Sequence, residues 1–442
     1  MISMNDNGDI LRKQLIRGAT GIAFSQVINR FLLLLLGVTL ARGLGTDGYG
    51  VYSYAFALLT LLVVFAELGM PTLILREIAA YQSQEDWAHM RGILVRSIQV
   101  VILSSIIIAM IAALVLNQID MWNSIAQSET LIWAVILLPF VALSKVIVAA
   151  VQGLQHVVRA QSVEMLVRPT LVLLCIGTIF YFYPDMRVPQ YAMAIQLVIA
   201  VVILFLAGGL LRRYVPQQIQ VTPTKYQTHQ WLASAVPLTL IGGAGMVNSQ
   251  TDILMLGFFR TPGEVGIYRV AVQGAALVAF GLQAANVVIA PQFARLYAQG
   301  DYDRLQRLVT KSARVILLAA LPVAVTFILA GGVIAAWVFG KEFMQSQTPM
   351  AVLAAGQLVN AAMGSVGFLL NMTRHERDVA RTLFITAGLN IILNFFFIPL
   401  YGMTGAAIAT SISLVLWNIL LYIIVKKRIG INSTAFHAAK GR

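Results

Sequence analysis

Apolar runs of about 20 residues recur along the whole chain and are separated by short polar segments. A hydrocarbon core about 30 Å thick requires about 20 apolar residues per spanning helix, so each run is long enough to cross a bilayer. The pattern therefore predicts an all-α polytopic membrane protein. The twelve predicted spans are residues 18–41, 51–68, 93–116, 131–151, 165–183, 189–211, 232–259, 266–291, 312–339, 350–371, 382–399 and 404–425.

Composition supports a location in lipid. Of the 442 residues, 59% are hydrophobic and 11% charged, and the mean hydropathy is +0.81, whereas about one-quarter of the residues in soluble domains are charged. The formal net charge of +13 does not indicate a nucleic-acid partner, because the basic residues gather near the ends of the apolar runs. The lone cysteine, Cys175, lies inside an apolar run, so we expect no disulfide framework, no metal site and no cofactor.

The basic residues also predict the orientation in the membrane. When each of the 31 Lys and Arg residues is assigned to the nearer membrane face, 24 fall on one face and five on the other. Arg30 and Lys145 lie well inside spans and are assigned to neither face; the five on the second face are Arg42, Arg187, Arg260, Arg269 and Lys341. Because Lys and Arg concentrate on the cytoplasmic side, both termini are expected in the cytoplasm, as for a bacterial inner-membrane protein. The first apolar run is too long for a signal peptide, so we expect it to be retained.

The chain carries an internal repeat. Residues 40–52 and 256–268 each contain a basic residue, a Gly or Pro turn, an acid and then the sequence Gly-hydrophobic-Tyr. Six predicted spans separate the two copies, so both run through the bilayer in the same direction. This predicts two six-helix bundles around a central cavity, formed by residues 1–211 and 231–442. The polar segment 212–230 is expected to be a cytoplasmic linker between them.

Polar side chains inside the bilayer are costly and therefore mark candidate functional positions. Arg30 lies midway along the first span, and Gln26 and Asn29 place further polar groups on the same helix. Lys145 and Gln152 share one face of the fourth span. We expect these side chains to line the cavity and to make its N-terminal half basic.

Acidic side chains are the candidates for ion coupling. Asn248 and Asp252 lie on a polar stripe of the seventh span. Asn248 is expected to line the substrate cavity, and Asp252 is the first candidate for ion coupling. An alternative is that Asp252 neutralises Arg30 or Lys145 in a buried ion pair. Glu67, near the inner end of the second span, is the second candidate, for which an interfacial capping role is the alternative.

The C-terminal third resembles the Wzx-type oligosaccharide flippases. The similarity rests on an ordered series of residues: Asn371 with a short basic turn, Asn390, Asn394, the sequence IPLYG at 398–402, the sequence GAA at 405–407, and Trp417. Near the N-terminus, similar elements are the sequence RGLG at 42–45, the sequence GVY at 50–52, the pair Leu68-Gly69, and Arg76. With the span count, the resemblance covers nearly the whole chain.

The resemblance implies membership of the multidrug/oligosaccharidyl-lipid/polysaccharide (MOP) exporter superfamily, whose members alternate between inward-open and outward-open states. The substrate would be a polyprenyl-diphosphate-linked oligosaccharide, such as a repeat unit of the lipopolysaccharide O-antigen, an exopolysaccharide or a capsule. Further partners would be membrane lipids, a proton or sodium ion, and a polysaccharide polymerase. An ion-coupled multidrug exporter of the same superfamily is the alternative. Lipid II flippases typically have fourteen helices, so twelve spans count against that assignment.

Motifs of enzymes are weak or missing. Asp301-Tyr302-Asp303 matches the DxD pattern of glycosyltransferases, but it lies in a short loop rich in Arg, where a solvated helix is the better interpretation. The sequence contains no GxxxxGK[ST] motif for nucleotide hydrolysis. We therefore expect a transporter and not an enzyme, driven by an ion gradient, the membrane potential or substrate flux.

Overall fold

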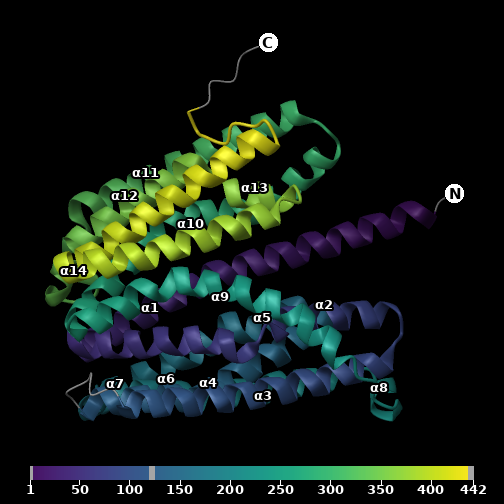
Figure 1. The fold of residues 1–442 in the computed structure, drawn as a ribbon, viewed down its shortest axis with the longest axis horizontal. Helices are drawn as coiled ribbons and strands as arrows, with labels where there is room; N and C mark the ends of the chain where they lie inside the picture. The colour runs from purple at the N-terminus through teal and green to yellow at the C-terminus, as the bar shows by residue number, and fades with distance from the viewer. Residues whose placement is uncertain (1–2, 119–124, 437–442) are drawn as a thin grey trace. The chain divides into compact units, whose positions relative to one another are not determined.

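The computed structural model describes residues 3–118 and 125–436, which are almost entirely helical (Figure 1). The α-helices are α1 Ser3–Glu67, α2 Met70–Ser83, α3 Trp87–Gln118, α4 Ile125–Gly153, α5 Val157–Ser162, α6 Arg168–Phe182, α7 Pro189–Tyr214, α8 Gln218–Val221, α9 Thr228–Phe259, α10 Pro262–Ala298, α11 Tyr302–Val338, α12 Gln347–Met363, α13 Val366–Met372 and α14 Glu376–Arg428. Three short elements complete the list: the π-helix η1 Val163–Val167 and the 3₁₀ helices η2 Pro184–Met186 and η3 Lys341–Ser346.

The helices confirm the predicted all-α membrane architecture. Nine helices of the described chain are long and apolar enough to cross a membrane, and the bent series from η3 through α13 supplies a tenth span. Two of these helices, α1 and α14, are interrupted by Gly45 and Gly402, whose φ angles are 67° and 56°. Only glycine adopts such a conformation readily. Each glycine therefore marks a break that divides its long helix into two segments, each long enough to cross the membrane. The described residues therefore supply the twelve spans predicted from the sequence.

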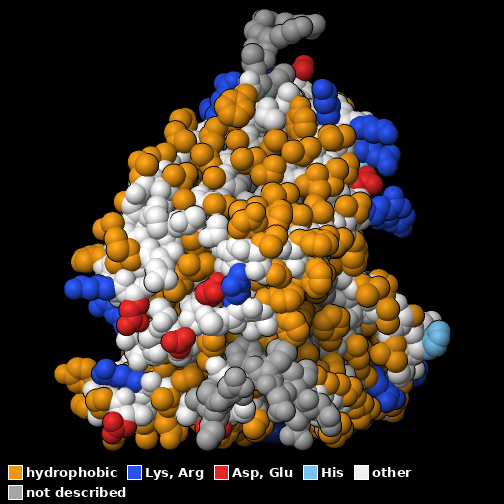
Figure 2. All heavy atoms as spheres, turned by 60° about the vertical axis from the view of Figure 1, so that its left-hand side comes forward, with side chains coloured by type: hydrophobic (Ala, Val, Ile, Leu, Met, Phe, Trp, Pro, Cys, Tyr) orange, Lys and Arg blue, Asp and Glu red, His pale blue; other side chains and the backbone are white. Residues whose placement is uncertain are grey.

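The outer surface is that of a protein surrounded by lipid. Hydrophobic side chains cover most of the face drawn in Figure 2, and charged side chains are few on it. Large apolar side chains are widely exposed, such as Phe205 at 75% and Trp337 at 80%. A soluble monomer rarely exposes a contiguous apolar surface of this kind, whereas a bilayer covers it.

Helix α2 was not predicted from the sequence, nor were the shorter helices α5 and α8. Helix α2 follows Gly69, which has a φ angle of 67°, and its 14 residues are too few to span the bilayer. Pro71 stands in its first turn, where the missing backbone N–H costs no hydrogen bond. The chain thus turns at the end of the second span and continues as a separate helix before α3.

The predicted linker is an ordered part of the fold. An Nη1 atom of Arg91 on α3 donates hydrogen bonds to the carbonyl oxygens of Gln220 and Thr222, at 3.2 and 2.8 Å. The backbone N–H of Lys225 donates to the carbonyl oxygen of Ala88 at 3.1 Å. These bonds attach the linker to the start of α3.

The chain divides into two compact units. The N-terminal unit comprises Met1–Gly43 and Ala55–Met246, and the C-terminal unit comprises Leu44–Tyr54 and Val247–Arg442. The division falls inside α9, and the short segment around the Gly45 interruption belongs to the C-terminal unit. The functional division predicted at residues 212–230 stays a prediction.

The two copies of the repeated segment pack against each other inside the C-terminal unit. A Cβ atom added to Gly50 would overlap the carbonyl oxygen of Pro262, and one added to Gly266 would overlap the carbonyl oxygen of Thr46. Each glycine is also close to the backbone nitrogen of the other. Small residues let two helix backbones approach in this way inside a membrane, where there is little hydrophobic force between helices.

After α14 the chain folds back onto the C-terminal unit. Asn432 exchanges two hydrogen bonds with the side chain of Gln306 on α11, at 2.7 and 2.8 Å. Arg314 donates to the carbonyl oxygen of Ala435 at 2.9 Å, and the N–H of Ala435 donates to the carbonyl oxygen of Ala362 at 2.9 Å. The segment therefore connects α11 to the end of α12, where the bent span breaks.

We expect Gly266→Val to lower the free energy of unfolding by about 1–3 kcal/mol, because the added side chain must displace backbone. The matched control is Gly208→Val on α7, where an added Cβ meets no atom within 4 Å. Unfolding of the purified proteins in detergent measures both. Equal stability of the two variants would contradict the close backbone contact.

Candidate functional site

An ion pair joins two of the predicted site residues in the N-terminal unit. Glu67 is the last residue of α1, and its Oε1 atom lies 3.0 Å from Nζ of Lys145 on α4. Glu67 is 8% exposed, whereas Lys145 is half-buried. A buried carboxylate is costly unless it is paired or hydrogen-bonded, and Lys145 supplies a partner of opposite charge. Both residues were predicted from the sequence as site residues, but the ion pair between them was not.

A second acid extends this cluster. Ser144 donates a hydrogen bond to Oε1 of Glu164 at 3.3 Å, and Arg168 lies 3.4 Å from Oε2 of the same carboxylate. The negative charge of Glu164 is also close enough to interact electrostatically with the carboxylate of Glu67. The N-terminal cluster, defined as Glu67, Lys145, Ser144, Glu164 and Arg168, therefore contains two carboxylates and two cations from three spans.

Glu164 was missed because it lies in η1, a single turn of π-helix between α5 and α6. This turn changes the spacing at which side chains share a face, so a 3.6-residue pattern does not align Glu164 with its neighbours. Wide turns of this kind occur frequently at functional sites. The one available signal was an acid four residues before Arg168 at the start of a predicted span.

The remaining predicted side chains of the N-terminal unit lie on the same two helices, α1 and α4. Arg30 is exposed on α1, and Gln26 and Asn29 are half-buried beside it. Gln152 is half-buried on α4, about two turns beyond Lys145. The structure thus leaves the Arg30 side chain accessible in the middle of an apolar helix.

Asp252 is the centre of a polar cluster in the C-terminal unit. Its Oδ2 atom accepts hydrogen bonds from Tyr268 Oη at 2.7 Å and Thr410 Oγ1 at 3.5 Å. Its Oδ1 atom accepts from the N–H of Ile253 at 2.9 Å, and Asp252 is only 6% exposed. The donors come from α9, α10 and α14. Asn248 is half-buried one turn earlier on α9.

Further polar groups surround Asp252. Arg269 follows Tyr268 on α10. Its positive charge interacts electrostatically with Asp252 and with Tyr49. Gln273 donates a hydrogen bond to the Tyr49 hydroxyl at 2.7 Å. From the sequence, Arg269 was counted with the charges at the second membrane face, whereas in the structure it lies inside α10, two turns after the start of this helix.

The two asparagines of the C-terminal motif continue the polar face of α14. Asn394 donates to the carbonyl oxygen and to the side-chain oxygen of Asn390, at 2.9 and 3.0 Å. Asn390 donates to Ser413 at 3.4 Å. Ser413 lies one turn beyond Thr410, so these amides and the Asp252 cluster share hydroxyls from the same helix face.

Lys145 and Asp252 each have partners within their own unit. Lys145 pairs with Glu67, while the carboxylate of Asp252 accepts hydrogen bonds from neutral groups. The alternative roles given above for Asp252 and Glu67 stay predictions.

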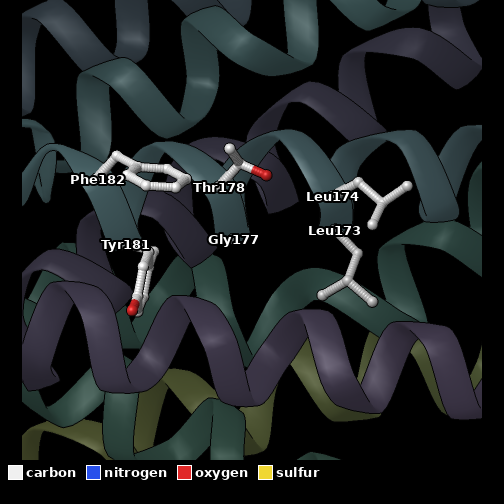
Figure 3. Close-up of a pocket in the computed structure, with 6 residues that line it drawn as sticks. All are labelled: Leu173, Leu174, Gly177, Thr178, Tyr181 and Phe182. Carbon is white, nitrogen blue, oxygen red and sulfur yellow. The ribbon is translucent and has the colours of Figure 1, made fainter.

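A shallow apolar pocket of about 480 Å³ lies on α6 (Figure 3). Its lining side chains all come from this one helix: Leu173, Leu174, Gly177, Thr178, Tyr181 and Phe182. The lining carries no charged group and includes no member of either polar cluster. A hydrocarbon chain suits such a surface better than a sugar or an ion does.

Comparison with known proteins assigns the chain to a family. The family model described as polysaccharide biosynthesis protein matches residues 15–297, which is more than half of the chain. Two relatives come from Haloferax volcanii. The probable low-salt glycan biosynthesis flippase Agl15 is 27% identical over 169 residues, which cover 38% of this chain and 36% of Agl15. The probable flippase AglR is 31% identical over 180 residues, which cover 40% of this chain and 37% of AglR.

Solved structures show that the fold is that of MOP superfamily transporters. An inward-closed structure of the lipid II flippase MurJ matches with a TM-score of 0.72 at 15% identity, over 91% of this chain and 87% of MurJ. An inward-facing multidrug transporter of the MATE family matches with a TM-score of 0.74 at 13% identity, over 92% of this chain and 98% of that chain. At these identities the likeness extends to the fold alone.

Removing one partner of the Glu67–Lys145 pair should destabilise the protein more than removing both. We expect Lys145→Met to cost about 1–3 kcal/mol, because a buried carboxylate loses its partner. Adding Glu67→Leu should restore part of this stability. A double-mutant cycle on unfolding in detergent measures the coupling, and purely additive effects would show that the pair contributes nothing.

Proposed function

Since this chain belongs to the polysaccharide biosynthesis protein family, we propose that it is a flippase for a polyprenyl-diphosphate-linked oligosaccharide. It moves an O-antigen, exopolysaccharide or capsule repeat unit from the cytoplasmic to the periplasmic leaflet by alternating access. It resides in the bacterial inner membrane with both termini in the cytoplasm, and it catalyses no covalent step. The relatives Agl15 and AglR are both described as probable flippases, which supports this assignment.

The chemistry of the substrate supports a protein-lined path. A sugar-diphosphate head is strongly hydrated and charged, so its transfer into hydrocarbon is very unfavourable. The polyprenyl tail has no such barrier and can stay in the bilayer. A flippase therefore needs polar and cationic side chains within its membrane spans but no cofactor.

The exposed Arg30 in the middle of an apolar span is the observation that carries the proposal. A guanidinium binds phosphate oxygens through two parallel hydrogen bonds, so Arg30 suits the diphosphate. The half-buried Lys145 offers a second cation in the same unit. Gln26, Asn29 and Gln152 supply hydrogen-bonding groups for the sugar hydroxyls.

The Glu67–Lys145 pair suggests how anion binding is coupled to a proton. In the observed structure the carboxylate neutralises the ammonium at 3.0 Å. An arriving phosphate that binds Lys145 displaces Glu67, and a displaced carboxylate in a poorly solvated site favours taking up a proton. Glu67 therefore serves as one coupling group.

Asp252 serves as the second coupling group. The oxygen atoms of Tyr268 and Thr410 lie beside its carboxylate at 2.7 and 3.5 Å, and Asn248 is one turn away. Carboxylate, hydroxyl and amide oxygens are suitable ligands for a hard cation such as sodium. The binding and release of a proton or sodium ion at Asp252 would bias the alternation between states.

Reconstitution tests the function directly. Purified protein in vesicles should expose a defined polyprenyl-diphosphate-linked oligosaccharide to the opposite leaflet, and vesicles without the protein should not. In cells, deletion should remove the surface glycan and leave drug sensitivity unchanged. Increased drug sensitivity with an intact glycan would favour the multidrug exporter instead.

We expect Arg30→Ala to reduce glycan flipping at least tenfold, because one charge-assisted contact to phosphate contributes about 1.5–3 kcal/mol. Arg30→Lys should retain part of the activity, since it keeps the charge without the two-pronged geometry. Flipping in vesicles measures the rates at matched protein content. Full activity of Arg30→Ala would remove Arg30 from the path.

Asp252→Asn should change the dependence of flipping on pH or sodium, because the amide keeps the shape of the side chain and removes its charge. Tyr268→Phe is the matched partner variant, which removes one hydrogen-bond donor to Asp252 and leaves the carboxylate. It should shift the same dependence without abolishing it. Identical pH and sodium profiles for Asp252→Asn and the unaltered protein would assign Asp252 a purely structural role.

A further inference from the structure

An aromatic residue at the end of α7 collects basic side chains around its ring. Tyr214 packs against His156, with ring centroids 3.8 Å apart and ring planes tilted by 40°. Arg159 donates a hydrogen bond to the Tyr214 hydroxyl at 2.7 Å, and its guanidinium carbon lies 5.4 Å from the ring centroid. The guanidinium carbon of Arg213 lies 5.9 Å from the same centroid. Together with Arg212, these residues form the Tyr214 cluster.

The position of the cluster is fixed by the core of the N-terminal unit. Tyr214 packs against a group of buried apolar side chains that includes Ile147, Val151 and Ala207. Apolar contacts therefore hold the ring in place, while its hydroxyl accepts the hydrogen bond from Arg159. Arg159, Arg212 and Arg213 are all exposed. The result is a rigid aromatic platform with three accessible guanidinium groups.

Among the described residues, no carboxylate forms an ion pair with these arginines. Other basic residues of the described chain form ion pairs, such as Arg304 with Asp301 and Arg428 with Asp378. None of those ion pairs includes a member of the Tyr214 cluster. Residues 154–163 and 207–221 contain no Asp or Glu. The cluster thus carries a formal charge of about three with no internal compensation.

The surroundings of the cluster are apolar on the side of the membrane spans. Phe205 and Leu206 on α7 are 75% and 45% exposed, and Val158 on α5 is 40% exposed. A ligand at this site therefore meets cations and a hydroxyl at the helix ends, with exposed hydrocarbon about two helical turns away along α7. This combination matches a lipid that carries a net negative head and acyl chains.

We propose that the Tyr214 cluster binds the phosphate head of an anionic glycerophospholipid. Arg159 and Arg213 contact the phosphate oxygens, Tyr214 sits at the level of the head group, and the acyl chains lie along the exposed side chains of α7. The site is independent of the proposed transport path, because it requires neither Arg30 nor Lys145. It gives the N-terminal unit a fixed contact with membrane lipid at one of its helix ends.

Lipid titration of the purified full-length protein in detergent tests the proposal. Dioleoylphosphatidylglycerol should bind and raise the unfolding temperature, whereas dioleoylphosphatidylcholine and inorganic phosphate at equal concentration should have much less effect. The triple variant Arg159→Gln/Arg212→Gln/Arg213→Gln should weaken phosphatidylglycerol binding roughly a hundredfold, at about fivefold per charge. Native mass spectrometry counts the bound lipid.

The matched control removes three exposed basic residues from the start of α11. Arg304→Gln/Arg307→Gln/Lys311→Gln changes the net charge equally and should leave the phosphatidylglycerol affinity within about twofold, because these side chains do not surround Tyr214. Equal losses in both triple variants would show a diffuse charge effect and overturn the site. Equal binding of phosphatidylcholine, or an equal effect of phosphate, would overturn the lipid class.

The single variant Arg213→Gln covers the case in which the triple variant does not fold. Arg213 is exposed, and its guanidinium group contacts the Tyr214 ring, so the protein should tolerate its replacement. Binding should fall about fivefold. An unchanged affinity would remove Arg213 from the site and contradict the proposal.

Discussion

A charged side chain in hydrocarbon costs several kcal/mol unless a partner compensates for its lost hydration, and this constraint determines where the chain carries polar groups. The buried Glu67 meets Lys145, and the buried Asp252 meets the hydroxyls of Tyr268 and Thr410. Each unit therefore holds one cluster of buried polar groups, and Arg30 is an exposed charge outside these clusters. Most of the remaining span surface is apolar.

The two clusters satisfy this constraint by different chemistry. In the N-terminal unit a cation neutralises the acid, so any new anion must compete with the carboxylate. In the C-terminal unit neutral hydroxyls solvate the acid, so a cation can join the site without breaking an ion pair. This difference supports assigning anion binding to the first unit and cation coupling to the second.

The sequence predicted the fold well because the bilayer imposes a length on every apolar run. All twelve spans follow from that length, even where α1 and α14 continue through Gly45 and Gly402. Helix α2 was missed because a 14-residue amphipathic helix has no such length requirement. The choice of Glu67, Lys145 and Asp252 followed from the rarity of charge inside spans.

The interaction partners of the site residues could not be predicted from the sequence. A helical pattern shows which residues share a face, but it does not show which helix lies opposite that face. Tyr268 and Thr410 approach Asp252 from positions 16 and 158 residues away. Glu164 was hidden by a π-helical turn, and Arg269 was assigned to a loop because it lies near the end of its span.

The hydrogen bonds made by Asn432 and Ala435 have a consequence for the order in which the protein is made. They join the end of the chain to α11 and to the broken span at α12, which are inserted into the membrane much earlier. The hydrogen-bond partner of the Ala362 carbonyl oxygen is the N–H of Ala435, which is synthesised more than seventy residues later. This hydrogen bond therefore forms only after that later segment has been translated. These contacts of the C-terminal unit are completed only after translation has passed α14.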